Sequence, residues 1–144
     1  MLAAVALLDP DHPQAAAVDR RLREELVIWL TTVSPEGQPQ STPVWFLWDG
    51  DAFLIYSQPG KPKLHNLADN PRASLHLRGD EQGDDVLIVE GRARLDPESP
   101  KADQVPAYVE KYRRSIEALE WTPASFAADY SEPVRVIPDR VRVW

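Results

Sequence analysis

Hydrophobic residues recur every three or four positions in four segments of this chain, and that spacing predicts amphipathic helices. The segments are residues 13–25, 63–69, 99–119 and a short stretch around 126–130. In the longest segment, Ser99 suits the position that caps a helix N-terminus, and Pro100 suits the first helical position. Its apolar stripe consists of Val105, Tyr108, Val109, Tyr112 and Ile116.

Other segments are short, rich in β-branched and aromatic residues and bounded by turn residues, which is typical of strands. Six strands are expected, over residues 26–33, 40–48, 52–57, 72–77, 85–95 and 134–143. Asp49-Gly50 joins the second strand to the third, and this pair favours a hairpin turn. Mostly sequential antiparallel strands with helices outside them predict a mainly β protein, a β-barrel with peripheral α-helices in a single domain of residues 1–144.

The second predicted strand is unusual because it is apolar on both faces. Its two faces carry Val44, Phe46 and Trp48, and Pro43, Trp45 and Leu47. One face can fill the barrel, so the other needs a cover. We expect a partner subunit or a ligand to supply that cover, and the alternative is that the protein's own helices do.

The charge balance limits the partners of the protein. Sixteen basic and 23 acidic residues give a net charge of -7, which opposes binding to nucleic acid. An anionic cofactor therefore needs a local basic cluster, and Lys61-Pro62-Lys63 supplies one at the start of a predicted helix, where first-turn amides also favour anions. The alternative is that these two are ordinary solvated surface lysines.

Metal chemistry and membrane attachment have little support in the sequence. The chain has no cysteine, which excludes disulfides and thiolate metal sites, and its three histidines lack metal-binding spacing. The apolar run over residues 1–8 is too short to span a bilayer and has no basic segment before it. We therefore expect a cytoplasmic protein without signal peptide, membrane anchor or metal.

An ordered set of short motifs points to a family. The motifs are Ser41-Thr42-Pro43-Val44-Trp45-Phe46, Tyr56-Ser57, Lys61-x-Lys63-x-x-Asn66-Leu67-x-x-Asn70-Pro71-Arg72-Ala73 and Val89-Glu90-Gly91-Arg92-Ala93. Together they resemble the pyridoxamine 5'-phosphate oxidase-like superfamily over about residues 29–95. They look most like the actinobacterial branch that uses the deazaflavin coenzyme F420. The resemblance implies a homodimeric, FMN-binding-like split β-barrel, with two cofactor sites in the grooves between subunits.

The resemblance also implies roles for single residues. Lys63 matches the phosphate ligand of the family, and Lys61 is placed to assist it. Tyr56 and Ser57 match positions that line the cofactor. The strand whose backbone faces the flavin-type ring corresponds to Ser41, Thr42, Pro43, Val44 and Trp45.

Three positions depart from the family pattern. Ser41 stands where flavin-binding relatives typically have arginine, Phe46 where the oxidases have a substrate-pocket lysine, and Val86 where a glutamine contacts the flavin. These departures favour coenzyme F420 over FMN and count against pyridoxine phosphate. The expected function is an F420-dependent oxidoreductase that reduces a small organic substrate by hydride transfer. The alternatives are an FMN-binding oxidoreductase of the same fold and a non-catalytic cofactor-binding protein.

Several polar residues are expected to be structural. The histidines at 65 and 76 are interpreted as ordinary surface or strand residues, and Asn66 and Asn70 as braces of the short helix. The group Tyr108, Lys111 and Tyr112 is expected to supply helix packing and a solvated lysine. No catalytic residue is named, because hydride chemistry belongs to the cofactor while the protein binds and orients it.

Overall fold

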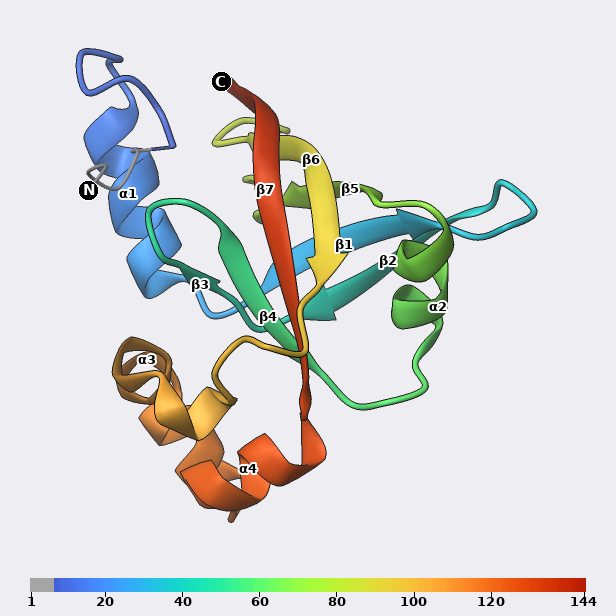
Figure 1. Ribbon diagram of the computed structural model, residues 1–144. Coiled ribbons are helices and arrows are strands. Elements are labelled where there is room, and N and C mark those ends of the chain that lie inside the picture. The colour runs from blue at the N-terminus through green and yellow to red at the C-terminus, as the bar shows by residue number, and fades with distance from the viewer. Residues whose placement is uncertain (1–6) are drawn as a thin grey trace.

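Seven strands form one curled antiparallel sheet in the computed structural model, which describes residues 7–144 (Figure 1). They are β1 Ile28–Val33, β2 Pro39–Val44, β3 Leu47–Trp48, β4 Phe53–Ser57, β5 Arg72–His76, β6 Leu87–Leu95 and β7 Glu132–Val143. Their order in the sheet is β2-β1-β5-β6-β7-β4-β3. The expected mainly β architecture is confirmed, with one strand more than predicted.

The extra strand arises because the expected strand over residues 40–48 is broken at Trp45–Phe46. At the break, the Phe46 amide donates to the Tyr112 hydroxyl at 2.8 Å. The Phe46 carbonyl accepts from the ammonium of Lys111 at 2.9 Å. Side chains from a distant helix thus replace the sheet partners of this backbone, and the chain turns from β2 into β3.

This break lies between the two edges of the sheet. Within residues 7–144, β2 pairs only with β1, and β3 pairs only with β4, so the edge strands are consecutive in the chain. The curled sheet is therefore closed through the covalent link at residues 45–46 rather than through a hydrogen-bonded ladder. A barrel split at this point leaves the edge of β2 free to line a site.

Within residues 7–144, four α-helices surround the sheet: α1 Ala15–Glu24, α2 Pro62–Asp69, α3 Pro106–Ala118 and α4 Pro123–Asp129. A short 3-10 helix, η1, spans Ala102–Gln104. The expectation of one helix over 99–119 is wrong, because Pro106 holds Val105 in an extended conformation and α3 begins after it. The Ser99 hydroxyl caps no helix, since it donates to Asp96 instead.

Two apolar clusters flank the break. Val44 and Phe46 are buried in the cluster enclosed by the sheet, whereas Trp45 and Leu47 pack against the cluster that includes α3 and α4. The alternation of the two faces is confirmed. Its cover is corrected: the protein's own helices lie on the second face, and Trp45 stacks on Tyr112 with ring centroids 4.5 Å apart.

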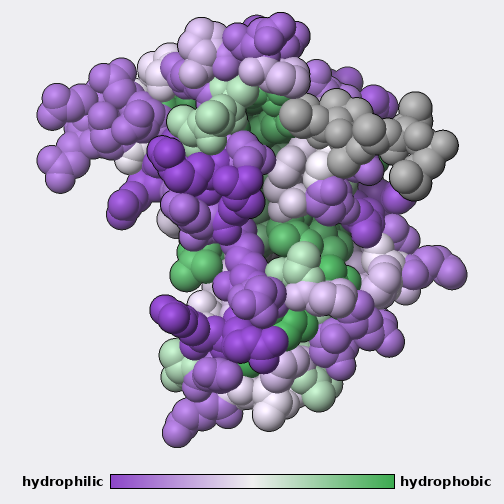
Figure 2. All heavy atoms as spheres, turned by 90° about the vertical axis from the view of Figure 1, so that its left-hand side faces the viewer, coloured by the Kyte–Doolittle hydropathy of each residue, from purple (hydrophilic) through white to green (hydrophobic). Residues whose placement is uncertain are grey.

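The side that carries α1 and α3 shows how the helical layer joins the barrel. Hydrophobic side chains appear there between the hydrophilic upper and lower parts of the molecule (Figure 2). Lys111 of α3 donates to the Leu22 carbonyl of α1 at 3.0 Å, and the Tyr112 hydroxyl donates to the Leu26 carbonyl at 2.7 Å. These bonds fix α3 against the end of α1.

The helices were compared with what a membrane-spanning helix requires. None of them in residues 7–144 combines the length and the apolar character that crossing a lipid bilayer requires. The expectation that the apolar N-terminal run is neither signal peptide nor anchor concerns residues 1–8, of which 1–6 lie outside the described residues.

Candidate functional site

Lys61 and Lys63 lie where two neighbouring pockets meet. We call the first the aromatic pocket; it has a volume of about 440 Å³ and is lined by Pro43, Val44, Trp45, Tyr56, Gln58, Lys61, Lys63, Leu119, Trp121, Phe126 and Tyr130. We call the second the polar pocket; it has a volume of about 470 Å³ and is lined by Thr32, Gln40, Ser41, Thr42, Lys61, Pro62 and Lys63. Both open beside β2, next to the split in the barrel.

Eight of the nine residues predicted for the site line one or both pockets. Ser41 and Thr42 belong to the polar pocket, and the lysines to both. Pro43, Val44, Trp45 and Tyr56 belong to the aromatic pocket. Ser57 lines neither pocket: its side chain is 1% exposed, and its hydroxyl donates to the Gln58 carbonyl at 2.8 Å.

The lysine pair concentrates positive charge without a counter-ion. Lys63 is half-buried, and neither lysine forms an ion pair with any residue in 7–144. Burial lowers the pKa of Lys63, and the positive charge of Lys61 lowers it further. An anion beside the two ammonium groups would offset the repulsion between them and favour the charged form of Lys63, so this spot suits a phosphate.

The N-terminus of α2 contributes less to this anion site than the sequence suggested. The amides of Leu64 and His65 already donate to the Lys61 carbonyl, at 3.0 and 3.4 Å. Pro62 has no N–H to offer. The anion site predicted at this helix start therefore relies mainly on the side-chain ammonium groups.

Buried hydrogen bonds hold α2 against the sheet. The side-chain amide of Asn66, which is 4% exposed, donates to the Thr32 hydroxyl at 2.9 Å and to the Gln40 side chain at 2.8 Å. Asn70 accepts from the Arg72 amide at 3.1 Å. Both asparagines brace the helix, as expected, and Asn66 fixes the wall between α2 and the polar pocket.

A stack of rings forms the inner wall of the aromatic pocket. Trp45 lies between Tyr112 and Phe126, at interplanar angles of 4° and 16°. Phe126 continues the stack to Tyr130, with centroids 4.6 Å apart. The ring of Tyr56 meets Tyr108 edge-on at 5.0 Å. Such a stack buries large apolar area and presents a rigid surface.

Tyr56 is fixed by its hydroxyl, which donates to the Pro100 carbonyl at 2.7 Å. Burial raises the pKa of Tyr56 to about 12, so the phenol stays protonated at neutral pH and is no base. Because its proton is already donated to a backbone carbonyl, Tyr56 is suited to shape the pocket rather than to exchange a proton.

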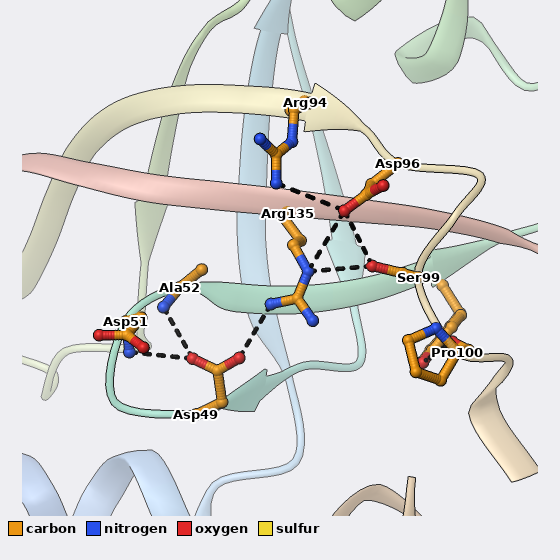
Figure 3. A network of polar contacts seen from close by, with 9 residues as sticks. Asp49, Asp51, Ala52, Arg94, Asp96, Ser99, Pro100 and Arg135 are labelled. Carbon is orange, nitrogen blue, oxygen red and sulfur yellow. Dashed lines mark hydrogen bonds and ion pairs between the residues drawn. The ribbon is translucent and has the colours of Figure 1, made fainter. Parts of the chain in front are cut away.

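A polar network holds the segment that carries Pro100 (Figure 3). The guanidinium of Arg135 on β7 donates to Ser99 at 3.0 Å and to the carboxylate of Asp49 at 2.9 Å. It also pairs with Asp96 at 3.6 Å. Burial would raise the pKa of Asp49, but hydrogen bonds from two backbone amides and from Arg135 outweigh it and lower this pKa. The network ties the turn at Asp49 and the segment that carries Ser99 and Pro100 to strand β7.

Other residues singled out from the sequence lie away from both pockets. His65 is exposed on α2, and His76 faces Trp29 across β5 and β1, with ring centroids 6.3 Å apart. Lys111 is a correction, because its ammonium is half-buried rather than fully solvated: it lies over the Phe46 ring, 3.6 Å from the centroid, and donates to two carbonyls. Burial lowers the pKa of Lys111 to about 8.

Sequence reasoning missed five of the residues that line the aromatic pocket. Gln58, Leu119, Trp121, Phe126 and Tyr130 line it, and four of them come from the α3–α4 region. The spacing of Phe126 and Tyr130 indicated a helix but not which way its apolar face points. Within residues 7–144, no group of three or more metal-ligating side chains comes together.

The chain matches one protein family over most of its length. Residues 15–144 match the family described as pyridoxamine 5'-phosphate oxidase. No curated protein sequence matches the chain.

Solved structures share the fold. The conserved hypothetical protein Rv2991 of Mycobacterium tuberculosis has a TM-score of 0.70 and 23% identity, covering 100% of this chain and 89% of its own. An F420 reductase has a TM-score of 0.64 and 22% identity over 93% of this chain and 98% of its own. HutZ, the heme storage protein of Vibrio cholerae, has a TM-score of 0.63 and 15% identity over 89% of this chain and 92% of its own.

Proposed function

Because the chain belongs to the pyridoxamine 5'-phosphate oxidase family, we propose that it is an oxidoreductase that binds coenzyme F420 and reduces a small organic substrate by hydride transfer. The observation that carries the proposal is the lysine pair at the junction of the two pockets. It is a concentrated positive charge in a chain of net charge -7, beside a free strand edge and an aromatic wall.

The residues present fit a phosphate-bearing, flat cofactor. Lys63 and Lys61 would hold its phosphate. The hydroxyls of Thr32, Ser41 and Thr42 would take hydrogen bonds from a polyol chain. As an edge strand, β2 has backbone groups that no strand of the described part of the chain pairs, and these suit the polar rim of a flavin-type ring. The bound cofactor would supply the hydride, while the chain binds, orients and excludes water.

Support for a deazaflavin over FMN comes from Ser41. Its hydroxyl lies 2.7 Å from that of Thr31, so the position is filled by a short, neutral hydrogen-bonded pair. An arginine there, typical of flavin-binding relatives, would add a third positive charge beside the lysines. The F420 reductase among the similar structures supports the same cofactor by fold.

The proposal includes a second copy of the chain. The outward rows of the sheet place Trp29, His76 and Ile88 side by side, and Thr31, Ser74 and Glu90 next to them. Pro43 and Ser41 of β2 extend these two rows to the edge that lines the pockets. Trp29 is 39% exposed there. A subunit packed on this face would cover that surface and border the cofactor groove.

The test is a parallel fluorescence titration of the purified protein with coenzyme F420 and with FMN. The proposal expects saturable binding of F420 in the micromolar range or tighter and weaker binding of FMN. A yellow protein that binds FMN more tightly would favour the flavin alternative. F420 binding without oxidation of the reduced coenzyme by any acceptor would identify a non-catalytic carrier. A cytoplasmic location is part of the proposal, and cell fractionation tests it.

A further inference from the structure

Thr32 of β1 and Gln40 of β2 lie opposite each other where Asn66 of α2 reaches the sheet. They are register partners in an antiparallel pair, so their side chains project from the same face, and both line the polar pocket. The side-chain NH2 group of Asn66 donates one hydrogen to the Thr32 hydroxyl at 2.9 Å and the other to the side-chain oxygen of Gln40 at 2.8 Å. Both hydrogens of this group are therefore used.

The bond from Asn66 decides which end of the Gln40 side-chain amide meets the pocket. Because Asn66 engages the Gln40 side-chain oxygen, the NH2 group of Gln40 points elsewhere, with two hydrogens to donate. This NH2 group finds no acceptor among residues 7–144. Thr32 likewise keeps the hydrogen of its hydroxyl, since its oxygen accepts from Asn66. The polar pocket thus meets the donor end of Gln40.

The surroundings of this NH2 group are positively charged. In the described part of the chain, the residues that line the polar pocket include Lys61 and Lys63 and no acidic residue. An amide that turned freely beside two ammonium groups would present its oxygen to them. The bond from Asn66 holds Gln40 the other way round. Three donor groups therefore share one space, and an anion is the ligand that such a set of donors stabilises.

Asn66 can fix this orientation because it is itself held firmly. Its side chain is 4% exposed and lies within α2, three residues after Lys63. Positions three apart lie on the same face of a helix, so α2 presents the lysine and the asparagine to the same side. One helix thus places a charged donor directly and a neutral donor indirectly, through Gln40.

From these contacts we infer that Gln40 donates to the phosphate held by the lysine pair, and that Asn66 is a positioning residue, which turns the Gln40 side-chain amide toward that phosphate. The inference deepens the proposed function and rests on it for the identity of the phosphate as part of the cofactor. An acceptor-only group such as a phosphate gains from every donor in this set. A group that also has hydrogens to donate finds no acceptor at Gln40.

Inorganic phosphate tests the donor directly, through proton–nitrogen correlation spectra of the side-chain amides in the isotope-labelled full chain. Gln40→Met, which keeps the length of the side chain, identifies the Gln40 signals by their loss. Phosphate added at constant ionic strength should shift these signals saturably. The signals of Gln38 should stay in place, because this side chain donates to the Pro39 carbonyl at 3.2 Å and lies outside both pockets. Gln40 signals that phosphate leaves unmoved overturn the inference.

A matched pair of substitutions tests the same donor with the cofactor. Gln40→Glu puts an acceptor and a negative charge where the donor was, and Gln38→Glu makes the same change two residues away. Fluorescence titration with coenzyme F420 should give at least about tenfold weaker binding for Gln40→Glu than for Gln38→Glu. Equal affinities in folded proteins overturn the inference, while F420 binding and the proposed function stand. Gln40 signals that shift with phosphate in a protein that does not bind F420 support the donor and overturn the cofactor.

The positioning role is tested by combining variants. Asn66→Ala frees the Gln40 side-chain amide to turn its oxygen outward, so it should weaken F420 binding severalfold. In the Gln40→Met background no amide is left to orient, and Asn66→Ala should have no further effect. An equal effect in both backgrounds overturns the positioning role, because Asn66 would then act only through the placement of α2.

The wild-type spectra test the orientation even where Asn66→Ala does not fold. The Gln40 NH2 hydrogens should exchange rapidly with water when no phosphate is present, because they have no acceptor in the protein, and phosphate should slow this exchange. Slow exchange without phosphate overturns the inference, because Gln40 would then donate to Asn66 and present its oxygen to the pocket.

Discussion

The Tyr112 hydroxyl occupies the break between β2 and β3, where it accepts from the Phe46 amide at 2.8 Å and lies 3.0 Å from the Phe46 carbonyl. The phenol therefore serves the backbone amide of a buried residue that has left the sheet, and Lys111 serves its carbonyl. The same break separates the two edges of the sheet and borders the aromatic pocket through Trp45. Because a buried amide without a partner is costly, this contact ties the stability of the fold to the geometry of the site.

Tyr112→Phe should lower the free energy of unfolding by about 1–3 kcal/mol, because it leaves the Phe46 amide buried without an acceptor. Tyr108→Phe is the matched control. The Tyr108 hydroxyl is buried and has no hydrogen-bond partner within residues 7–144, so its removal should be neutral or stabilising. Urea denaturation of both variants measures the difference. Equal destabilisation by the two substitutions would contradict the role given to Tyr112.

Lys111 should make stability depend on pH. Its folded-state pKa of about 8 lies below the ordinary value of 10.5, mainly through burial. Between these values the unfolded chain still holds a proton that the folded protein has released, so this residue makes the free energy of unfolding rise with pH. Below pH 8 Lys111 is charged in both the folded and the unfolded state, so the cost of burying its charge lowers the free energy of unfolding in full. Urea denaturation between these two pH values should show a free energy of unfolding that rises with pH in the wild type and less so in Lys111→Met. If the two proteins show the same pH dependence, the lowered pKa of Lys111 is contradicted.

Glu120→Gly should raise the free energy of unfolding by about 1 kcal/mol, because glycine adopts the left-handed conformation without the side-chain penalty that glutamate has there. The same substitution three residues earlier, Glu117→Gly, lies inside α3 and should lower stability by about 1 kcal/mol. Thermal denaturation of the two variants gives opposite shifts if α3 ends as described. Denaturation midpoints that shift in the same direction for both variants would contradict an α3 that ends with Glu120 in the left-handed conformation.

The proposed second copy can be tested at Trp29. Replacing it with glutamate places a charge in the outward row beside His76 and Ile88, and should convert a dimer into a monomer in sedimentation equilibrium. Leu26→Glu is the control, since Leu26 is 43% exposed on the link between α1 and β1. A wild-type protein that is already monomeric at high concentration would remove the proposed interface.

The sequence predicted much of the fold because local patterns decided it. The alternation over residues 43–48 assigned each side chain to the correct face, and Asp49-Gly50 correctly placed the turn before β4. The break at Trp45–Phe46 was not predictable from that pattern. It depends on Tyr112 and Lys111, more than sixty residues further along the chain, and a tertiary contact of this kind leaves no periodic signal.

The part of the site that consists of short sequence motifs was predictable. The part that depends on how the helices pack together was not. The lysine pair and residues 41–45 lie beside the pockets as the family resemblance implied. The Trp121 side of the aromatic pocket depends on how α3 ends and how α4 packs, which the helical period alone leaves open. Lys111 was interpreted as solvated because a lysine on a helix usually is, but its charge is half-buried over Phe46.

The most direct test of the central claim is the affinity of Lys63→Ala for coenzyme F420, measured by fluorescence titration beside Lys101→Ala. Both variants lose one positive charge, but Lys101 lies outside the two pockets and donates to the Ser131 carbonyl. We predict that Lys63→Ala weakens binding by about ten- to hundredfold, the loss of one charged hydrogen bond, and that Lys101→Ala leaves it nearly unchanged. A folded Lys63→Ala protein with wild-type affinity would contradict the account, because the lysine pair would then not be the anion site of the cofactor.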